Sequence, residues 1–555
     1  MTDCDVVVIG AGHQGLVAAI VLAEAGLEVV VVEAADSVGG AVKSGQITLP
    51  GYEHDMYAMN MNLFLGSPFY ADHADVLAAH GLRFATSRQP YASAFPDGSS
   101  LRVDSDESLT LAMWAEHNAA DAAGWTRLGR VFDDVASAYL PLYGSPLPSR
   151  SALQAVHAAW RSRKSTGLGE LSQILLSSTR ALGERYFETR EARALVAAWG
   201  MHLDYAPDVT AGAIFPLLEL FLDMRNGMSV VQGGASRLPE ALQSVVEECG
   251  GRIATGEAAT RIQVEGGRVR AVTLAGGESL RTRRGVISTV VLPVLVRDLL
   301  ASQVVPESLR AGAERYRFGP GTFMLHLALN GPIPWTDPRL STSAYVHLGP
   351  YVDDMARTYQ QALSGCLPDE PLLVVGQTSV VDPSRVLHPN HHIVWVQARM
   401  VPGSIVNDAG VVDGRSLAGS SWASARDPFA HRVMNKLCHY APGLPELIVA
   451  ATPMSPRDLE SANANLVGGD SVAGSHHLDQ FFGLRPTLSA ARYSTPIEGL
   501  YLAGAGTWPG AGVNAVSGQL AARKLLSQQL RASGLSMRAS RAVKRVRTTA
   551  ENVIR

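Results

Sequence analysis

The sequence predicts an α/β protein in which a dinucleotide-binding domain is assembled from both ends of the chain. One observation behind this prediction is the apolar stretch 5–41, which contains a GxGxxG loop. The other is the stretch 499–526, which has the pattern of a short strand, a glycine turn and the start of a helix. We expect the two stretches to bind opposite ends of one ligand.

The stretch 5–41 has the order of a βαβ unit. Residues 6–9 are a β-branched apolar run, which is typical of a parallel strand buried on both faces. Residues 16–25 have helix-forming composition, Gly26 ends that helix, and residues 27–32 form a second apolar run. Glycines and polar residues interrupt the stretch too often for a membrane span, so it predicts a strand, a helix and a strand.

The glycines of this unit have separate expected roles. Gly10 permits a tight turn, Gly12 lets the backbone approach a pyrophosphate, and Gly15 allows the helix to pack closely on the strand. The helix N-terminus offers free N–H groups to phosphates. Glu33, at the end of the second strand, is placed to accept hydrogen bonds from ribose hydroxyls.

Gly39 and Gly40 complete a Glu-x5-Gly-Gly pattern that begins at Glu33. This pattern resembles an extension found in FAD proteins of the glutathione-reductase-like fold, and the resemblance implies FAD rather than NAD. His13 lies inside the first glycine loop. We expect it either beside the pyrophosphate or flavin, or as a loop residue without a chemical role.

In the C-terminal stretch, Gly504 and Gly506 form the expected turn after the strand at 500–503. Gly512 and Val513 precede the helix. The N–H groups of this helix start are expected to face the pyrimidine end of the flavin, where they would stabilise negative charge.

The centre of the chain predicts an insertion and a second sheet. Alanine, leucine and arginine dominate 105–199, a helical pattern that suits a substrate lid, a membrane-facing cap or plain scaffold. Short strands with Gly-Gly turns between 252 and 289 indicate a meander that returns to the first domain. Apolar strands between 290 and 480 indicate a substrate domain. No second GxGxxG follows a strand, so we expect one dinucleotide.

The predicted fold class is therefore α/β, a glutathione-reductase-like Rossmann FAD-binding domain with a mixed-sheet substrate domain and a helical insertion. The expected parts are FAD-binding segments at 1–104, 226–290 and 481–530, a helical insertion at 105–225, a substrate domain at 291–480 and a basic tail at 531–555.

Composition argues against several classes of function. A chain of 555 residues with 46% hydrophobic and 18% charged residues suits two or three domains with real cores. The net charge of −4 gives no reason to expect nucleic acid. The four cysteines lack CxxC spacing, and the histidine pairs 391–392 and 476–477 are adjacent, which is poor geometry for chelation. We therefore assign no metal and no redox dithiol.

Five motifs carry a resemblance to a known family: GAGHQGLVAA (10–19), VGGA (38–41), QGGASRLPEAL (232–242), LDQFFGLRP (478–486) and RYSTPIEGLYLAGAGTWPGAGV (492–513). They resemble the phytoene-desaturase-like family of FAD oxidoreductases. That family includes carotenoid desaturases, retinol saturases and the proteins named pyridine nucleotide-disulfide oxidoreductase domain-containing protein 2, to which GAGHQGL and LDQFF point. The family often continues its last motif with Thr-Gly-Ala, whereas this chain has Asn-Ala-Val at 514–516.

The resemblance implies an FAD-dependent oxidoreductase that acts on C–H or C=C bonds of an apolar, carotenoid- or retinoid-like molecule. The flavin would exchange the hydride and the protein would position the substrate. We expect His54, His202, Asp204 and Arg485 to line the site. One alternative is a flavin amine oxidase, although Ala41 stands where such enzymes commonly have arginine. Another is a flavoprotein with a mainly binding or regulatory role.

The end of the chain is strongly basic. Residues 531–555 contain six arginines and one lysine against one glutamate. Such a tail is typical of a peripheral membrane contact, which would suit a lipid-soluble substrate, and also of a solvated end. No secretory signal pattern opens the sequence, so we expect a cytoplasmic protein, either free or membrane-associated. The oligomeric state, the direction of hydride transfer and the electron acceptor stay open.

Overall fold

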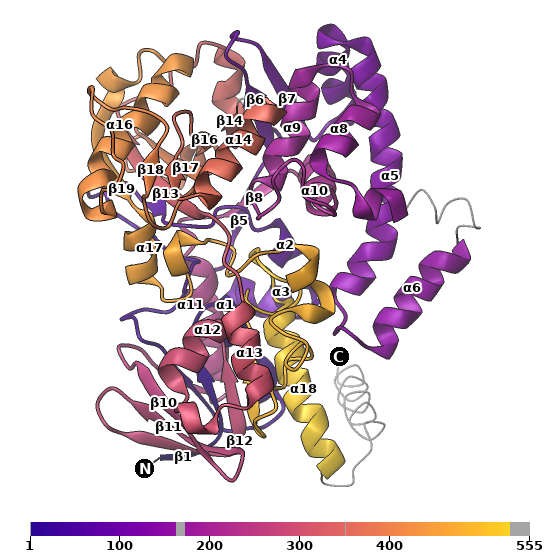
Figure 1. Cartoon of the computed structure of the whole chain (residues 1–555), viewed down its shortest axis with the longest axis vertical. Helices are drawn as coiled ribbons and strands as arrows, with labels where there is room; N and C mark the ends of the chain where they lie inside the picture. Colours follow the sequence, from indigo (N-terminus) through magenta and orange to yellow (C-terminus); the bar gives the residue numbers. More distant parts are fainter. Residues whose placement is uncertain (1, 163–171, 350, 533–555) are drawn as a thin grey trace.

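The computed structural model of the chain describes residues 2–162, 172–349 and 351–532, which form two seven-stranded sheets (Figure 1). The first sheet joins both ends of the chain. Its order is β10 (Ala259–Glu265), β11 (Arg268–Leu274), β12 (Ser279–Ser288), β1 (Thr2–Ile9), β2 (Val29–Val32) and β9 (Arg252–Ala254), with β20 (Leu500–Leu502) also paired to β12.

The predicted βαβ unit is confirmed. β1 pairs in parallel with β2, and α1 (His13–Glu24) connects them. The valines of β1 are fully buried because each face of the strand packs into a different apolar cluster, one of which includes α1. Burial on both faces explains the continuous apolar run at 6–9. The meander is confirmed as well, since β10, β11 and β12 pair antiparallel in sequence order.

The two ends of the chain meet in this sheet and on its face. β12 pairs in parallel with β1 on one side and with β20 on the other. α18 (Val516–Ala532) then packs against α1. The contact is close, because a Cβ placed on Gly518 would lie 2.1 Å from the carbonyl oxygen of Gln14. The expected joining of the first and last segments is therefore present.

The second sheet lies at the other end of the molecule (Figure 1). Its order is β19 (Ile448–Met454), β13 (Gly321–Leu329), β17 (His392–Val401), β16 (Leu372–Gly376), β14 (Tyr345–Leu348), β6 (Tyr91–Ala94) and β7 (Ser100–Val103). It is mixed, because β14 pairs in parallel with β6 and antiparallel with β16. α16 (Trp422–Tyr440) covers one face of this sheet with its aromatic side chains.

The structure corrects one expected boundary. Strands β6 and β7 fall within 1–104, which we assigned to the first domain, yet both belong to the second sheet. Strand β19 is a partly exposed strand at the edge of this sheet, where it pairs with β13. In both cases the partner strand is remote in sequence, so local patterns do not identify it.

Helices fill most of the predicted insertion and stand beside the second sheet (Figure 1). They are α4 (Glu107–His117), α5 (Ala119–Tyr143), α6 (Arg150–Ser162), α8 (Thr179–Tyr186), α9 (Arg190–Gly200) and α10 (Ile214–Asn226). Their shared core contains Trp114, Trp125 and Phe221. No helix in the described ranges is both long and apolar enough to span a bilayer. Residues 533–555 of the basic tail lie outside the described residues, so the membrane contact stays a prediction.

Candidate active site

Two neighbouring cavities that share lining residues lie where the first sheet, the second sheet and the insertion helices meet. The inner chamber, of about 230 Å³, is bordered by both glycine motifs and the second sheet. The outer chamber, of about 520 Å³, is bordered mainly by α10, the end of α5 and the segments 62–68 and 476–482. Five residues line both chambers and mark their junction: Leu63, Leu203, Phe215, Glu219 and Ala511.

One wall of the inner chamber is made by residues from the two ends of the chain. These are His13, Ala41, Val42, Ala505, Gly512 and Val513. The facing wall is aromatic and comes from α9, β14 and β17. It includes Trp199, Tyr345 and Trp395, and the last two rings stack at 5.7 Å. The chamber therefore joins the nucleotide-binding motifs to an apolar surface suited to a flat ring.

The first glycine loop has the geometry that its sequence predicts. Gly10 has a φ of +96°, which favours glycine, and a Cβ there would lie 2.2 Å from Oγ1 of Thr289. A Cβ on Gly15 would lie 2.0 Å from the carbonyl oxygen of Gly10. The loop that contains Gly39 packs on this turn, since the Gly39 N–H donates to the carbonyl oxygen of Ala11 at 2.9 Å.

The residues of this region fit FAD. Gly12 is the N-cap of α1 and supplies no side-chain acceptor to the first N–H groups of the helix, which suits a pyrophosphate. Glu33 accepts hydrogen bonds from the N–H groups of Ala11 and Ala35 at 2.7 and 2.9 Å and keeps partial exposure for a ribose. His13 presents a buried Nε2 that has no hydrogen-bond partner among the described residues.

His13 is a neutral group in this setting. Burial lowers the pKa of its imidazole to about 4, so the ring carries no charge near neutral pH. Since His13 lines the inner chamber, its free nitrogen is available to a bound ring or phosphate. FAD would therefore meet α1 with its pyrophosphate, Glu33 with its ribose and the inner chamber with its flavin.

The second glycine motif forms a turn that is braced from α18. The Gly504 N–H donates to Oγ of Ser517 at 2.9 Å, and the Thr507 hydroxyl donates to the Gly504 carbonyl oxygen at 2.9 Å. Gly506 lies in this turn, close to Val291. Gly504 and Gly506 thus shape the turn, whereas Gly512 and Val513 reach the chamber.

Of the four polar residues expected to line the site, His202 lines the inner chamber. Its Nε2 lies 2.7 Å from Nε2 of His347, so one ring donates this hydrogen bond and the other accepts it. Burial holds the pKa of His202 well below its usual value, and the proximity of His347 and Arg399 adds to this effect. His202 is therefore a neutral hydrogen-bonding group beside the inner chamber.

The other three expected residues line neither chamber, which corrects the expectation. Arg485 is buried, and its guanidinium donates to five carbonyl oxygens, those of residues 472–475 and Ala505. Asp204 accepts hydrogen bonds from the hydroxyls of Tyr359 and Ser475 at 2.9 and 2.5 Å. These two residues hold the segment 472–475 beside the second glycine motif.

His54 lies in the short strand β4 (His54–Asp55), away from the chambers. Its Nε2 is 2.8 Å from Oγ1 of Thr48, and its ring packs edge-on against His326. Burial lowers the pKa of His54 to about 4, with a smaller contribution from the cation of Arg385. These contacts with Thr48 and His326 hold the side chain in the core, and the neighbouring Asp55 is paired with Arg385.

Polar residues that the sequence did not single out also face the inner chamber. Arg399 donates to the carbonyl oxygen of Met201 at 3.1 Å and to the hydroxyls of Thr322 and Ser471 at 3.1 and 2.7 Å. Glu219 lines both chambers. These residues come from separate elements, so no motif links them. Within the described ranges, no group of three or more histidine, cysteine or acidic residues is arranged to hold a metal.

Comparisons with known proteins identify the family of the chain. The family model described as "Flavin containing amine oxidoreductase" matches residues 15–359, more than half of the chain. The pyridine nucleotide-disulfide oxidoreductase domain-containing protein 2 of Rattus norvegicus is 26% identical over 94% of this chain and 93% of its own length. A polypeptide of the limonene dehydrogenase of Castellaniella defragrans is 24% identical, with 95% of both chains covered.

A solved oxidoreductase from Methanosarcina mazei superposes with a TM-score of 0.60, at 15% identity, over 94% of this chain and all of its own. This likeness shows the fold. The relatives confirm the resemblance that the five motifs indicate, including the group to which GAGHQGL and LDQFF point.

Proposed function

The chain belongs to the flavin-containing amine oxidoreductase family, and we propose that it exchanges a hydride between FAD and a C–H or C=C bond of an apolar small molecule. FAD-dependent oxidation and reduction are common to the family. The proposal for this chain concerns the substrate, which would be an isoprenoid-like hydrocarbon or a close derivative. The dehydrogenase relative, whose name gives limonene as its substrate, supports this choice.

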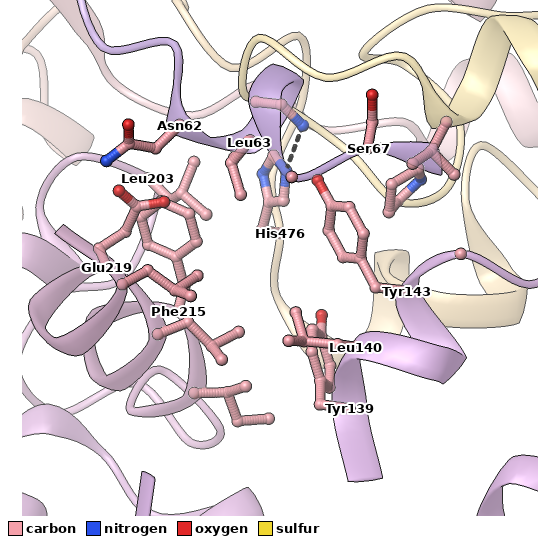
Figure 2. A pocket seen from close by; sticks show the side chains of 18 of the residues that line it. Asn62, Leu63, Ser67, Tyr139, Leu140, Tyr143, Leu203, Phe215, Glu219 and His476 are labelled. Atoms are coloured by element: carbon pink, nitrogen blue, oxygen red, sulfur yellow. Dashed lines mark hydrogen bonds between the residues drawn. The ribbon is translucent and has the colours of Figure 1, made fainter. Parts of the chain in front are cut away.

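The observation that carries the proposal is the apolar lining of the outer chamber, which shares five residues with the inner chamber. We call the two chambers together the channel. Most side chains around the outer chamber are leucine, isoleucine, phenylalanine or tyrosine, among them Leu140, Ile214, Leu218, Leu222 and Phe481. Figure 2 shows Tyr139, Leu140, Leu203 and Phe215 around this space. A long apolar molecule in this channel would bury its surface away from water, and one of its ends would reach the inner chamber.

When bound, FAD supplies the hydride acceptance or donation. The protein's residues position the two partners. The aromatic wall of Trp199, Tyr345 and Trp395 would hold the reacting part of the substrate against the wall formed by Ala505, Gly512 and Val513. The apolar surroundings exclude water, which protects the transferred hydride equivalent.

Amine oxidation is the second candidate, because the matching family model covers amine oxidoreductases. An amine substrate would place a positive charge in a mostly apolar channel. Arg399, buried beside the inner chamber, would oppose that charge. The apolar lining of the outer chamber and Arg399 favour the apolar substrate, whereas the Glu219 carboxyl at the junction is the group that an amine would use.

The test is anaerobic reduction of the purified FAD-loaded protein, which is monitored by the absorbance of the flavin. Limonene, a set of polyenes, retinol, primary amines and NAD(P)H would each be mixed with the oxidised protein. We expect bleaching by a hydrocarbon or retinoid and none by amines. Bleaching by amines alone would establish the second candidate, and a flavin that no compound reduces would favour a binding role.

A further inference from the structure

Glu219 on α10 occupies an unusual position between the two chambers. It is 6% exposed and is one of the five residues that line both cavities. Figure 2 shows its carboxyl group at the edge of the cavity, next to Leu203 and Phe215. A substrate that extends from the outer into the inner chamber would pass this carboxyl.

The Glu219 carboxyl has no hydrogen-bond donor and no ion-pair partner among the described residues. Two hydroxyls around the outer chamber bond internally: that of Ser67 donates to the carbonyl oxygen of Phe64, and that of Tyr205 to the carbonyl oxygen of His476. The buried Nδ1 of His476, which lines the outer chamber but not the inner one, lacks a partner within the described residues. The Tyr143 hydroxyl also lacks a partner within the described ranges, but Tyr143 lines the outer chamber alone. Glu219 is therefore a buried polar group that a ligand at the junction can satisfy.

Asp223, one helical turn further along α10, differs from Glu219 because it is well supplied with donors. The side-chain amides of Asn60 and Asn62 donate to its two carboxylate oxygens at 2.9 and 2.6 Å. These hydrogen bonds stabilise negative charge on Asp223. When the pair holds one proton, Asp223 is thus the better site for the charge and Glu219 the better site for the proton.

The surroundings of Glu219 also favour a proton on its carboxyl group. Burial raises the pKa of Glu219 well above its usual value, and the neighbouring Asp223 raises it further. The titratable groups that interact with Glu219 are Asp223, Tyr91, Tyr143 and Tyr345. Within the described residues none of these groups is a cation that would offset the burial of the Glu219 carboxyl, so its surroundings favour the neutral form, which carries an O–H.

We propose that the Glu219 carboxyl donates a hydrogen bond to an oxygen atom of an otherwise apolar substrate, and so selects a hydroxyl-, carbonyl- or ether-bearing molecule over a pure hydrocarbon. This inference rests on the proposed function, because it specifies the substrate class of the same channel. A substrate carboxylate would find no cation among the titratable groups around Glu219 to balance its charge, so the oxygen belongs to a neutral group.

A first test reads the protonation of Glu219 without any ligand. Infrared spectra of the FAD-loaded protein at pH 7 should contain the carbonyl stretch of a protonated carboxyl that disappears in Glu219→Gln. The band should shift when 1-decanol binds and stay in place with n-decane. If Glu219→Gln leaves the protonated-carboxyl region unchanged, Glu219 is ionised and the proposal is wrong.

A second test compares the binding of 1-decanol, n-decane and decylamine to the FAD-loaded protein by calorimetry. Glu219→Leu should weaken the binding of 1-decanol about tenfold, equivalent to about 1.4 kcal/mol, and leave the affinity for n-decane unchanged. Glu219→Gln keeps a donor and should retain 1-decanol affinity within about threefold. Tyr143→Phe is the matched control, and it should leave the selectivity between the two probes unchanged.

Other outcomes overturn the inference in distinguishable ways. Equal losses for both probes in Glu219→Leu would remove the selective role and leave the apolar channel intact. Loss of selectivity in Tyr143→Phe instead would assign the oxygen to Tyr143. Tighter binding of decylamine than of 1-decanol would make Glu219 a receptor for cations. Binding of no probe at all would overturn both this inference and the proposed channel.

Discussion

The side chain of Gln14 on α1 is hydrogen-bonded to Asn514, 500 residues further along the chain. Its Nε2 donates to the Asn514 carbonyl oxygen at 2.5 Å and to the Asn514 Oδ1 at 3.1 Å. Its Oε1 accepts from the Gly518 N–H at 2.7 Å. One buried amide thus joins the first glycine loop to the start of α18, the two segments that would enclose the flavin.

Replacing Gln14 with leucine should separate these two segments. The change leaves the buried Gly518 N–H and Asn514 carbonyl without partners, which should lower the free energy of unfolding by about 2 to 4 kcal/mol. FAD should be lost on gel filtration. Urea denaturation and flavin content measure the two effects. Gln243→Ala, which removes an exposed hydrogen bond to Glu247, is the control, and equal effects of the two changes would contradict the prediction.

Gly15→Ala should disrupt the βαβ unit itself. The new methyl group would lie 2.0 Å from the Gly10 carbonyl oxygen, so α1 must move away from β1. We expect destabilisation by about 2 to 3 kcal/mol and weaker FAD binding. In Gly276→Ala the nearest atom lies 4.0 Å away, and the change should stay within about 0.5 kcal/mol. Thermal unfolding of the two variants would check this difference.

Buried histidines should make the protein sensitive to acid. Burial, together with a smaller contribution from the neighbouring His54, lowers the pKa of His326 to about 3. Because the unfolded chain takes up this proton near pH 6.5, folding stability falls as the pH drops from about 6.5 towards 3. The free energy of unfolding that is lost between pH 7 and pH 4 should therefore be smaller by about 3 kcal/mol in His326→Leu.

Chemical denaturation at a series of pH values measures this dependence. The exposed His431 provides the control, since His431→Leu should leave the pH dependence as in the natural chain. If the free energy of unfolding falls equally with decreasing pH in His326→Leu and in the natural chain, His326 does not contribute to the acid sensitivity.

Leu203→Trp should close the junction between the chambers. Leu203 lines both cavities and lies in one apolar cluster with Ala511 of the second glycine motif, and a larger side chain there would block an apolar substrate. Flavin reduction by a substrate that bleaches the natural protein should slow by at least about tenfold, or about 1.4 kcal/mol. FAD content should be unchanged. Leu387→Trp, at a site 87% exposed, is the control, and unchanged kinetics in Leu203→Trp would reject the channel.

Arg485→Lys should test whether Arg485 acts in chemistry or in structure. A lysine cannot reproduce the forked donors that reach Ser475 and Ala505 at 2.8 and 2.7 Å. We expect a loss of about 2 to 4 kcal/mol in stability and a lower FAD content. Turnover per bound flavin should stay near the natural rate. Full stability and flavin content with lost turnover would instead make Arg485 a catalytic residue.

Much of the first domain was predictable because its signals are local. The valines before Gly10, the spacing of the glycines and Glu33 at the end of β2 each depend on neighbours within about one turn or strand. The Gly-Gly turns at 266–267 and 276–277 likewise predicted the β10–β12 meander, which the pairing confirms. Arg485 shows the limit of this reasoning, since a charged residue in a motif suggested chemistry but proved to hold carbonyl groups.

The sequence by itself determined the order of strands, turns and helices at both termini and hence the cofactor class, because backbone preferences and apolar periodicity act over short distances. The tertiary structure alone decided that β6 joins β14, that Gln14 meets Asn514 and that Glu219 faces the junction of two chambers. Each of these depends on which remote surface packs against an element. A carboxylate on a helix is solvated or buried according to that partner, and no pattern within α10 specifies the partner.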